Sequence, residues 1–290
     1  MKLKSFLRKA ESVLNRLDAW LPPETREPDW NAAAFRWQKS GNKGILESLP
    51  APHTFPLSRL AAVDSQTAKL VRNTEQFLAG RPANNVLLTG SRGTGKSSLV
   101  KALLHEYGAI GLRLIEVDKS DLATLPALLQ LLASRPEKFI VFCDDLSFED
   151  GEDGYKALKT ALDGSLSQRC ANVLVYATSN RRHLMPEYMD ENTGHTGVRG
   201  EVHAKEAVEE KISLSDRFGL WLSFYPFDQN DYLQAVANWL EYYGVDFDDT
   251  AQRAALNWSQ MRGGRSGRVA WQFACDWAGR LPQDRSLNLG

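Results

Sequence analysis

Apolar segments alternate with amphipathic segments through the central part of the chain. Five short segments are apolar almost throughout, as expected of strands that are buried on both faces; they cover residues 85–90, 112–117, 139–144, 172–179 and 220–227. Apolar residues with helical spacing occupy residues 65–79, 96–107, 121–135, 155–166 and 207–218. Strands of this kind that alternate with helices predict an α/β fold, a five-stranded parallel sheet between two layers of helices.

The pattern changes towards both ends of the chain. After Pro226 only helical periodicity remains, at residues 228–243, 249–261 and 267–280. Residues 3–20 also have helical period, and three prolines between positions 22 and 28 then mark a linker. The sequence therefore predicts an N-terminal amphipathic helix with its linker over 1–58, an α/β domain over 59–227 and a small all-α domain over 228–290.

The N-terminal helix carries basic residues on much of its polar face. Contact of residues 1–20 with a membrane surface is one interpretation. Packing on its own domain or on a neighbouring subunit is favoured, because the acidic residues Glu11 and Asp18 dilute the basic face.

Composition limits the class of protein. The formal net charge of -1 argues against a chain that is basic overall and binds nucleic acid over its whole surface. The three cysteines are widely spaced and fit neither a disulfide framework nor a zinc site, so a reducing cytoplasm is the simplest setting. We expect no secretory signal and no transmembrane segment, because no apolar run approaches the length of a membrane span.

A glycine-rich turn follows the first predicted strand. Its sequence, GSRGTGKS at residues 90–97, matches the phosphate-binding pattern G-x-x-x-x-G-K-[ST]. Glycines permit positive φ and let backbone N–H groups surround phosphate oxygens, while the helix that follows adds its positive end. Lys96 would reach the β- and γ-phosphates, and the Ser97 hydroxyl would bind Mg²⁺. The predicted nucleotide site comprises Gly90, Ser91, Arg92, Gly93, Thr94, Gly95, Lys96, Ser97 and Ser98.

Two adjacent carboxylates, Asp144 and Asp145, end the strand at 139–144. Like charges repel, and beside an apolar strand they are poorly solvated, so a bound cation would reduce their cost. In P-loop proteins a carboxylate at this place holds the nucleotide's Mg²⁺. We predict that Asp144 is a metal ligand with Ser97, and that Asp145 orients the attacking water and accepts its proton. An ordinary pair of loop residues that caps the next helix is the alternative.

Three classes of P-loop protein compete. A GTPase would need a base-reading N-K-x-D, but the similar run at residues 118–121 precedes the acidic strand when it should follow it. Nothing marks the second substrate site and lid of a nucleotide kinase. The third class inserts a strand between the phosphate loop and the acidic strand, and residues 112–117 supply one.

That class also surrounds the γ-phosphate with polar and cationic side chains. Asn180 follows the strand that ends ATSN and could hold the water or the γ-phosphate, or it could simply terminate the strand. Arg217 precedes the fifth strand and could reach a neighbouring subunit's nucleotide, or serve as a cation at a helix C-terminus. Arg268 begins the last helix and could report bound ATP, or belong to a phosphate-contacting cluster with Arg262 and Arg265.

The motifs GSRGTGKS, FIVFCDD, ATSN, SDRF and GRSGR follow one another in the order typical of AAA+ ATPases. The chain resembles that superfamily and, in stretches such as NTEQFLAG, FCDDLSFE and LSDRFGLWLSFYPFDQ, a bacterial family catalogued as domain of unknown function 815. The resemblance implies an AAA+ core with a helical lid, ATP and Mg²⁺ as ligands, and a ring or partial ring in which Arg217 acts in trans. It implies AAA+ roles for Lys96, Ser97, Asp144, Asn180, Arg217 and Arg268, and it names no client.

The acidic pair departs from the usual AAA+ pattern. Most of these ATPases have Asp-Glu where this chain has Asp144-Asp145, and an Asp carboxylate is about 1.5 Å shorter. Misplacing a catalytic base by that distance can lower a rate by about 100-fold. We therefore expect slow turnover to be possible, with ATP serving mainly as a switch.

The predicted site is compatible with two functions. One is a mechanochemical ATPase that remodels or loads an unknown protein or nucleic-acid client, with Phe148 considered as a pore-loop residue and residues 194–211 as a contact for the partner. The other is a nucleotide-gated binding module that hydrolyses ATP slowly. In that case ATP binding would assemble the protein or load a client, and DNA is one candidate surface for loading, contacted through Arg181, Arg182 and the basic cluster at 262–268.

Overall fold

The computed structural model describes residues 27–40, 43–148, 153–163, 170–180 and 214–281. The predicted N-terminal helix, Arg181, Arg182 and the segment at 194–211 lie outside these residues.

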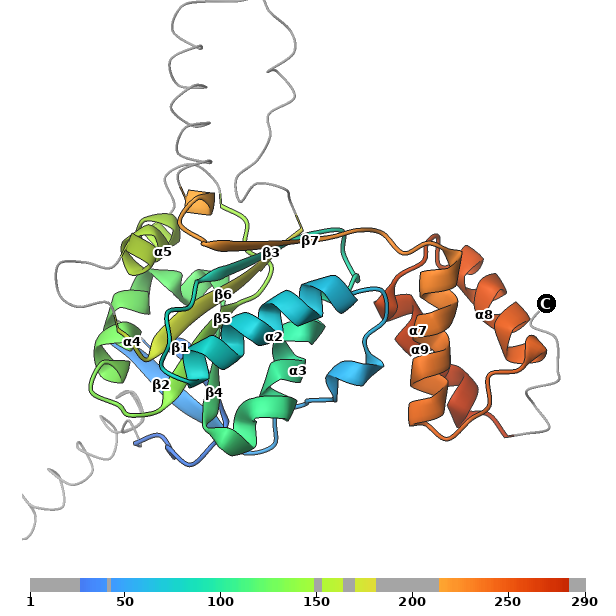
Figure 1. Ribbon diagram of the computed structural model, residues 1–290, viewed down its shortest axis with the longest axis horizontal. Coiled ribbons are helices and arrows are strands. Elements are labelled where there is room, and N and C mark those ends of the chain that lie inside the picture. The colour runs from blue at the N-terminus through green and yellow to red at the C-terminus, as the bar shows by residue number, and fades with distance from the viewer. Residues whose placement is uncertain (1–26, 41–42, 149–152, 164–169, 181–213, 282–290) are drawn as a thin grey trace, which may run out of the picture.

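A seven-stranded sheet forms the centre of the molecule (Figure 1). Its spatial order is β2-β1-β4-β5-β6-β3-β7, and all neighbouring strands are parallel except β1 and β2. The strands are β1 (Ala34–Ser40), β2 (Lys43–Leu49), β3 (Val86–Gly90), β4 (Leu112–Val117), β5 (Lys138–Cys143), β6 (Val173–Ser179) and β7 (Leu220–Phe224). The five predicted strands are therefore present as a parallel sheet, and β6 separates β3 from β5.

Residues 34–49 correct the prediction of a five-stranded sheet and of a linker that reaches residue 58. They form an antiparallel hairpin, and β1 pairs in parallel with β4. Phe35 and Trp37 are buried, and Trp37 Nε1 donates a hydrogen bond to Thr124 Oγ1 at 2.8 Å. Gly44 lets the Trp37 indole pack across β2, since a Cβ there would lie 1.7 Å from the ring.

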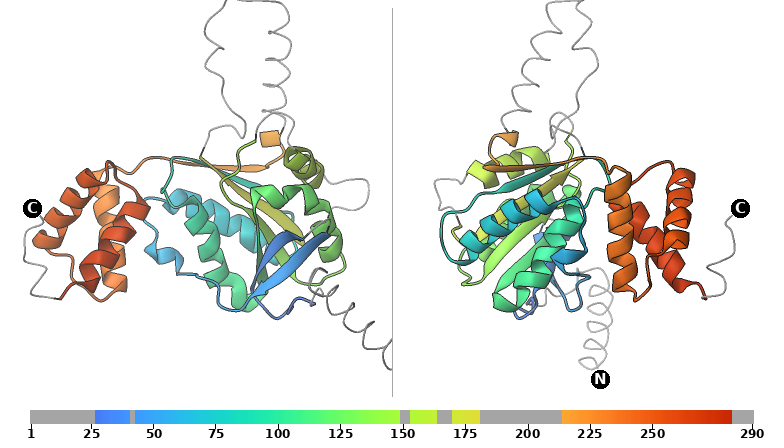
Figure 2. Two further views of the ribbon diagram at one scale, coloured as in Figure 1. Left: turned by 180° about the vertical axis from the view of Figure 1, so that it is seen from behind. Right: turned by 45° about the vertical axis from the view of Figure 1, so that its right-hand side comes forward.

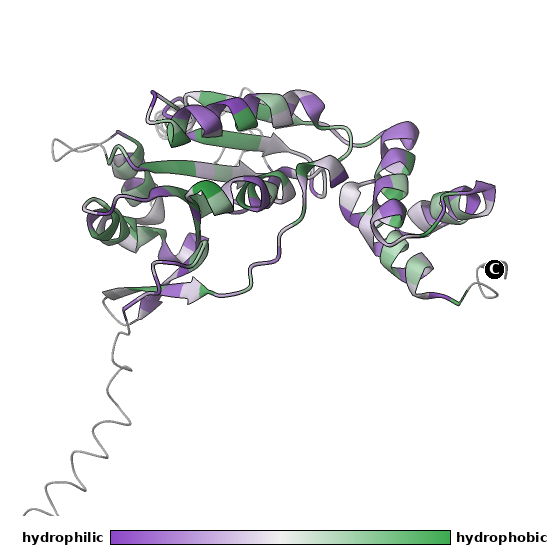
Figure 3. Ribbon diagram, turned by 60° about the horizontal axis from the view of Figure 1, so that its bottom comes forward, coloured by the Kyte–Doolittle hydropathy of each residue, from purple (hydrophilic) through white to green (hydrophobic). Residues whose placement is uncertain are grey.

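Helices cover both faces of the sheet (Figure 3). On one face, α2 (Asp64–Leu78) and α3 (Lys96–Tyr107) share a core with Ile140 and Phe142 of β5. On the other face, α4 (Leu125–Leu132) and α5 (Asp153–Asp163) share a core with Phe139 and Val141. Successive β5 residues thus enter opposite cores, which explains the continuous apolar run of this strand.

The described residues of the α/β part also contain three short 3-10 helices: η1 (Leu57–Arg59), η2 (Gly108–Ile110) and η3 (Lys119–Thr124). The helix predicted over 121–135 is therefore divided into η3 and α4, because Pro126 fits the first turn of a helix but not its interior. Phe148 is fully buried and packs edge-on against Tyr155, so the idea that it is a pore-loop residue is wrong for this structure.

The C-terminal helices α7 (Gln229–Tyr242), α8 (Asp249–Met261) and α9 (Gly267–Gly279) lie beside the sheet and have a core of their own (Figure 2). Each starts with a side-chain cap. Asp228 and Asp231 form a reciprocal capping box on α7, while Asp248 and Ser266 cap α8 and α9.

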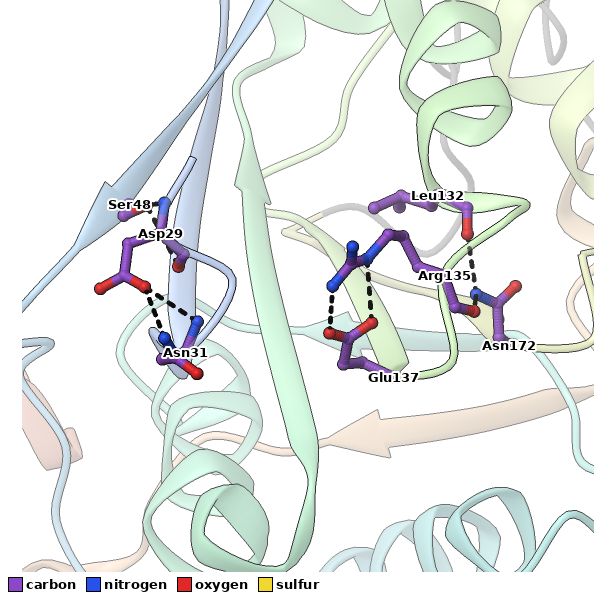
Figure 4. A network of polar contacts seen from close by, with 7 residues as sticks. All are labelled: Asp29, Asn31, Ser48, Leu132, Arg135, Glu137 and Asn172. Carbon is purple, nitrogen blue, oxygen red and sulfur yellow. Dashed lines mark hydrogen bonds and ion pairs between the residues drawn. The ribbon is translucent and has the colours of Figure 1, made fainter. Parts of the chain in front are cut away.

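Two polar networks fix segments beside the strands: one joins the end of α4 to the starts of β5 and β6, and the other joins the segment before β1 to β2 (Figure 4). Arg135 donates two hydrogen bonds to Glu137, and this contact lowers the pKa of the Glu137 carboxyl. Asn172 donates to the carbonyls of Leu132 and Arg135, and so satisfies the end of α4. In the second network, the Asp29 backbone N–H donates to Ser48 Oγ at 2.7 Å.

Candidate nucleotide site

The glycine-rich loop joins β3 to α3 in a conformation that suits glycine. Gly90, Gly93 and Gly95 have φ of 129°, 76° and 96°. Gly90 also needs to lack a side chain, because a Cβ would lie 1.9 Å from the carbonyl oxygen of Phe224 on β7. Helix α3 begins at Lys96 after Gly95, so no side chain caps its first N–H groups. Free N–H groups at a helix N-terminus favour an anion.

Lys96 lies inside the loop and is only 6% exposed. Its Nζ donates to the carbonyls of Gly90 (2.8 Å) and Ser91 (2.7 Å) and to Asn180 Oδ1 (3.0 Å). Burial lowers the pKa of this ammonium, and the charges of Asp144 and Asp145 oppose that shift. All three N–H groups of Lys96 are engaged, so a bound phosphate would replace one of these neutral acceptors with a charged one, which makes a stronger hydrogen bond.

Asp144 follows β5 and meets residues from two other elements. Its Oδ1 accepts hydrogen bonds from Ser97 Oγ and from Thr178 Oγ1, each at 2.5 Å. Ser97 comes from the first turn of α3 and Thr178 from β6. The predicted metal ligands Ser97 and Asp144 therefore lie together at the carboxyl edge of the sheet.

Asp145 lies beside them in the left-handed region, with φ of 51°. Its backbone N–H donates to Thr178 Oγ1 at 2.9 Å and to Asp144 Oδ1 at 3.1 Å. Its carboxylate accepts a very short hydrogen bond from Asn180 Nδ2. The Asn180 amide therefore links the Asp145 carboxylate to the Lys96 ammonium.

A cavity of about 640 Å³ opens over these residues and extends to the C-terminal helices. Arg92, Thr94 and Ser98 line it on the loop side, and Arg268 lines it on the α9 side. Helix α9 touches the loop itself, because a Cβ on Gly93 would lie 2.9 Å from Ser266 Oγ. Aromatic side chains complete the wall: His53, Phe55, Phe227, Trp239 and Trp271.

Arg217 does not join this group. It forms an ion pair with Asp163 of α5 and lines a different cavity, at the opposite ends of the strands. Of the predicted site residues, the structure thus brings together the loop, Asp144, Asp145, Asn180 and Arg268, and leaves Arg217 apart.

Sequence reasoning missed several residues of the cavity. Thr178 stands two positions before Asn180, and its position at the polar end of an apolar strand was the available signal. His53, Phe55 and Arg59 lie in a segment without periodicity, so only the tertiary structure reveals them.

The sequence matches the family described as "Protein of unknown function (DUF815)" over residues 30–281. The chain belongs to this family. The match includes the glycine-rich loop, the acidic pair and all three C-terminal helices. No match to the chain was found among the curated proteins.

Solved structures with similar folds include AAA+ proteins. The FIGL-1 AAA domain in complex with ADP aligns with a TM-score of 0.53 at 16% identity, covering 82% of this chain and 79% of that one. A variant of Thermotoga maritima RuvB gives 0.51 at 16% identity, covering 77% and 63%. The replication initiator DnaA bound to AMPPCP and single-stranded DNA gives 0.50 at 14% identity, covering 78% and 65%. The DUF815 chain therefore has the AAA+ fold, and it spans slightly less than two thirds of the RuvB chains.

Two further findings concern the cysteines and the length of the helices. All three cysteines are free thiols. In the described part of the chain, every helix is too short or too polar to cross a membrane.

Proposed function

We propose that this DUF815 protein binds ATP with Mg²⁺ between the glycine-rich loop and the acidic pair. One observation carries the proposal: Lys96, the Ser97–Asp144 pair and Asn180 come from three elements and converge at one end of one cavity. The loop N–H groups and Lys96 would hold the phosphates. The aromatic wall at Phe55, Trp239 and Trp271 would cover the base.

The donor set fits Mg²⁺. Ser97 and Asp144 offer oxygen ligands, and no group of three or more His, Cys, Asp or Glu side chains forms a metal cage among the described residues. Mg²⁺ is usually held by one or two protein oxygens together with substrate phosphates and water. When bound, it would act as a Lewis acid on the phosphoryl oxygens.

For hydrolysis, Asp145 would accept the proton of the attacking water, and Asn180 would orient that water or the γ-phosphate. Arg268 approaches the same cavity from α9, so the C-terminal helices would serve as a lid that responds to nucleotide. Arg217 lies far from the cavity of its own chain, which supports action on a neighbouring subunit in a homo-oligomer.

A second candidate is a nucleotide-gated switch with little steady-state turnover. The observation that favours it is the short Asp145 carboxylate, which is already engaged by Asn180. On this hypothesis Asp145→Glu raises kcat, because the longer side chain brings the base closer to the phosphate.

For both candidate functions, the client is an unidentified protein or nucleic acid. DnaA, whose fold is similar and whose structure contains single-stranded DNA, suggests nucleic acid only by analogy. In this chain, the candidate contact is the exposed basic cluster Arg262, Arg265 and Arg268, of which Arg262 lies over the Trp258 ring.

The experiment is steady-state ATP hydrolysis by wild type and Asp145→Asn, with Asp246→Asn as a control at an exposed acid outside the cavity. We expect Asp145→Asn to lower kcat by about 100-fold or more while ATP binding is kept, because an amide cannot accept the proton. Turnover that is equal in wild type and Asp145→Asn would contradict the assignment of the base.

A further inference from the structure

The hydroxyl group of Thr178 contacts both acids of the candidate site. It donates to Asp144 Oδ1 at 2.5 Å and accepts the Asp145 backbone N–H at 2.9 Å. Thr178 is 1% exposed, so water cannot replace either bond without a rearrangement. We infer that Thr178 is a positioning residue, which sets the rotamer of the metal-binding carboxylate and the backbone of the catalytic acid together. This inference rests on the proposed function.

The conformation of Asp145 explains why such a group is needed. A residue other than glycine in the left-handed region is strained, and it persists only when its surroundings hold it there. Asp145 has φ of 51°, and its N–H is fixed by Thr178 Oγ1.

The next residue of the turn is fixed to the same strand. The Leu146 N–H donates to the Thr178 carbonyl at 2.7 Å, and Ser179 Oγ donates to the Leu146 carbonyl at 2.8 Å. Residues 178 and 179 of β6 therefore hold the turn at Asp145 and at Leu146. Among these contacts, the Thr178 hydroxyl also bonds the Asp144 carboxylate.

The position of Thr178 also bears on the presence of aspartate, the shorter acid, at residue 145. The turn presents the Asp145 carboxylate to Asn180 Nδ2, two residues beyond Thr178 and just after the end of β6. The left-handed backbone at Asp145 points its carboxylate at the Asn180 amide, so the short aspartate side chain reaches the amide without the extra methylene of glutamate. A change at Thr178 should consequently affect the chemistry more than the binding of phosphate.

The test compares Thr178→Val, which keeps the shape of the side chain and removes the hydroxyl, with Thr178→Ser, which keeps the hydroxyl. Thr160→Val is the control, since the Thr160 hydroxyl donates to the Lys156 carbonyl within α5 and is not among the residues that line the candidate site. The measurements are kcat and KM for ATP, the Mg²⁺ concentration for half-maximal activity, and the ATP affinity both in EDTA and in Mg²⁺.

For Thr178→Val we expect kcat to fall by about 10- to 100-fold, because both acids lose their shared contact. The Mg²⁺ requirement should rise about 3- to 10-fold, and the gain in ATP affinity on adding Mg²⁺ should shrink, while the affinity in EDTA stays at the wild-type value. Thr178→Ser should return these quantities to within about 3-fold of wild type. A purely structural role for Thr178 would lower stability without changing the Mg²⁺ requirement of the folded protein, and that result would overturn the inference.

A second measurement needs no catalysis. If Asp145 is held in the left-handed region, Asp145→Gly should melt about 2–4 °C above Asp145→Ala, since only glycine adopts that φ without strain. Equal melting temperatures would overturn the inference even if Thr178→Val does not fold. A wild type that binds no ATP would instead overturn the proposed function, so the two failures are distinguishable.

Discussion

At the scale of single residues, Gly93 is the point where the phosphate loop contacts the C-terminal helices. Its φ is 76°, and Ser266, the cap of α9, lies against the place where a side chain would be. The absence of a side chain therefore allows the loop conformation and the close approach of α9 at the same time. Arg268 reaches the cavity from the first turn of that helix.

We predict that Gly93→Ala weakens ATP binding by about 10-fold or more, because the new methyl group strains the loop and displaces α9. Gly80→Ala is the matched control, since Gly80 has a similar φ of 69° but open space around its Cα. Both variants should lose stability to the strained φ, Gly93→Ala somewhat more because of its contact with α9, and only Gly93→Ala should lose ATP affinity in calorimetry. Equal ATP affinities in the two variants would contradict the role given to this contact.

At the scale of elements, one buried polar group joins α2 to the sheet. The Tyr176 hydroxyl of β6 lies 2.9 Å from Thr74 Oγ1 and accepts from Asn73 Nδ2 at 3.0 Å. Asn73 also pairs with the backbone of Asn84, just before β3. Burial raises the pKa of Tyr176, as expected for a phenol that stays neutral inside the core.

We predict that Tyr176→Phe lowers the free energy of unfolding by about 1–3 kcal/mol, because two buried polar groups on α2 lose a partner. Tyr225→Phe, at a tyrosine that is 71% exposed, should change it by less than about 0.5 kcal/mol. Chemical denaturation of the two variants measures the difference. A loss for Tyr176→Phe no greater than that for Tyr225→Phe would show that the network adds no stability.

The elements also show what the sequence could predict. The strands β3 to β6 were predictable because both of their faces are buried, so their apolar residues are nearly continuous. Strand β7 lies at the edge of the sheet and exposes Trp221 and Ser223, but its sequence is still apolar enough to predict a strand. Strand β1 was missed because polar residues follow Trp37 and its partner strand contains Gly44, whose role appears only when the indole packs across it. The loop and Asp144 were predictable from a local motif, whereas the bonds of Thr178 depend on the pairing of β5 with β6.

At the scale of the whole molecule, Arg217 and the candidate site lie at opposite ends of the strands. A trans role would bring Arg217 of one subunit to the loop of the next, and its pairing with Asp163 would hold it ready at the surface. The proposal of a homo-oligomer depends on this separation.

We predict that Arg217→Ala binds ATP as wild type does and loses hydrolysis by about 100-fold or more. Arg280→Ala, which removes a similar ion pair on the C-terminal helices, should leave hydrolysis unchanged. In an equal mixture of Arg217→Ala and Lys96→Ala, an interface is active when one subunit supplies an intact Lys96 and its neighbour an intact Arg217. Random assembly gives this combination at about a quarter of the interfaces, so the mixture should recover activity. If the mixture is as inactive as its parts, Arg217 does not act in trans.

The central claim is that ATP and Mg²⁺ occupy the cavity between the glycine-rich loop and the acidic pair. Isothermal titration calorimetry of ATP with Mg²⁺ tests it most directly on three proteins: wild type, Lys96→Ala and, as the control, Lys69→Ala on the exposed face of α2. The account predicts one site per chain in wild type and Lys69→Ala, and an affinity at least about 100-fold lower in Lys96→Ala, because the buried ammonium meets the phosphates. ATP binding of equal strength in wild type and Lys96→Ala, or no binding to any of them, would contradict it.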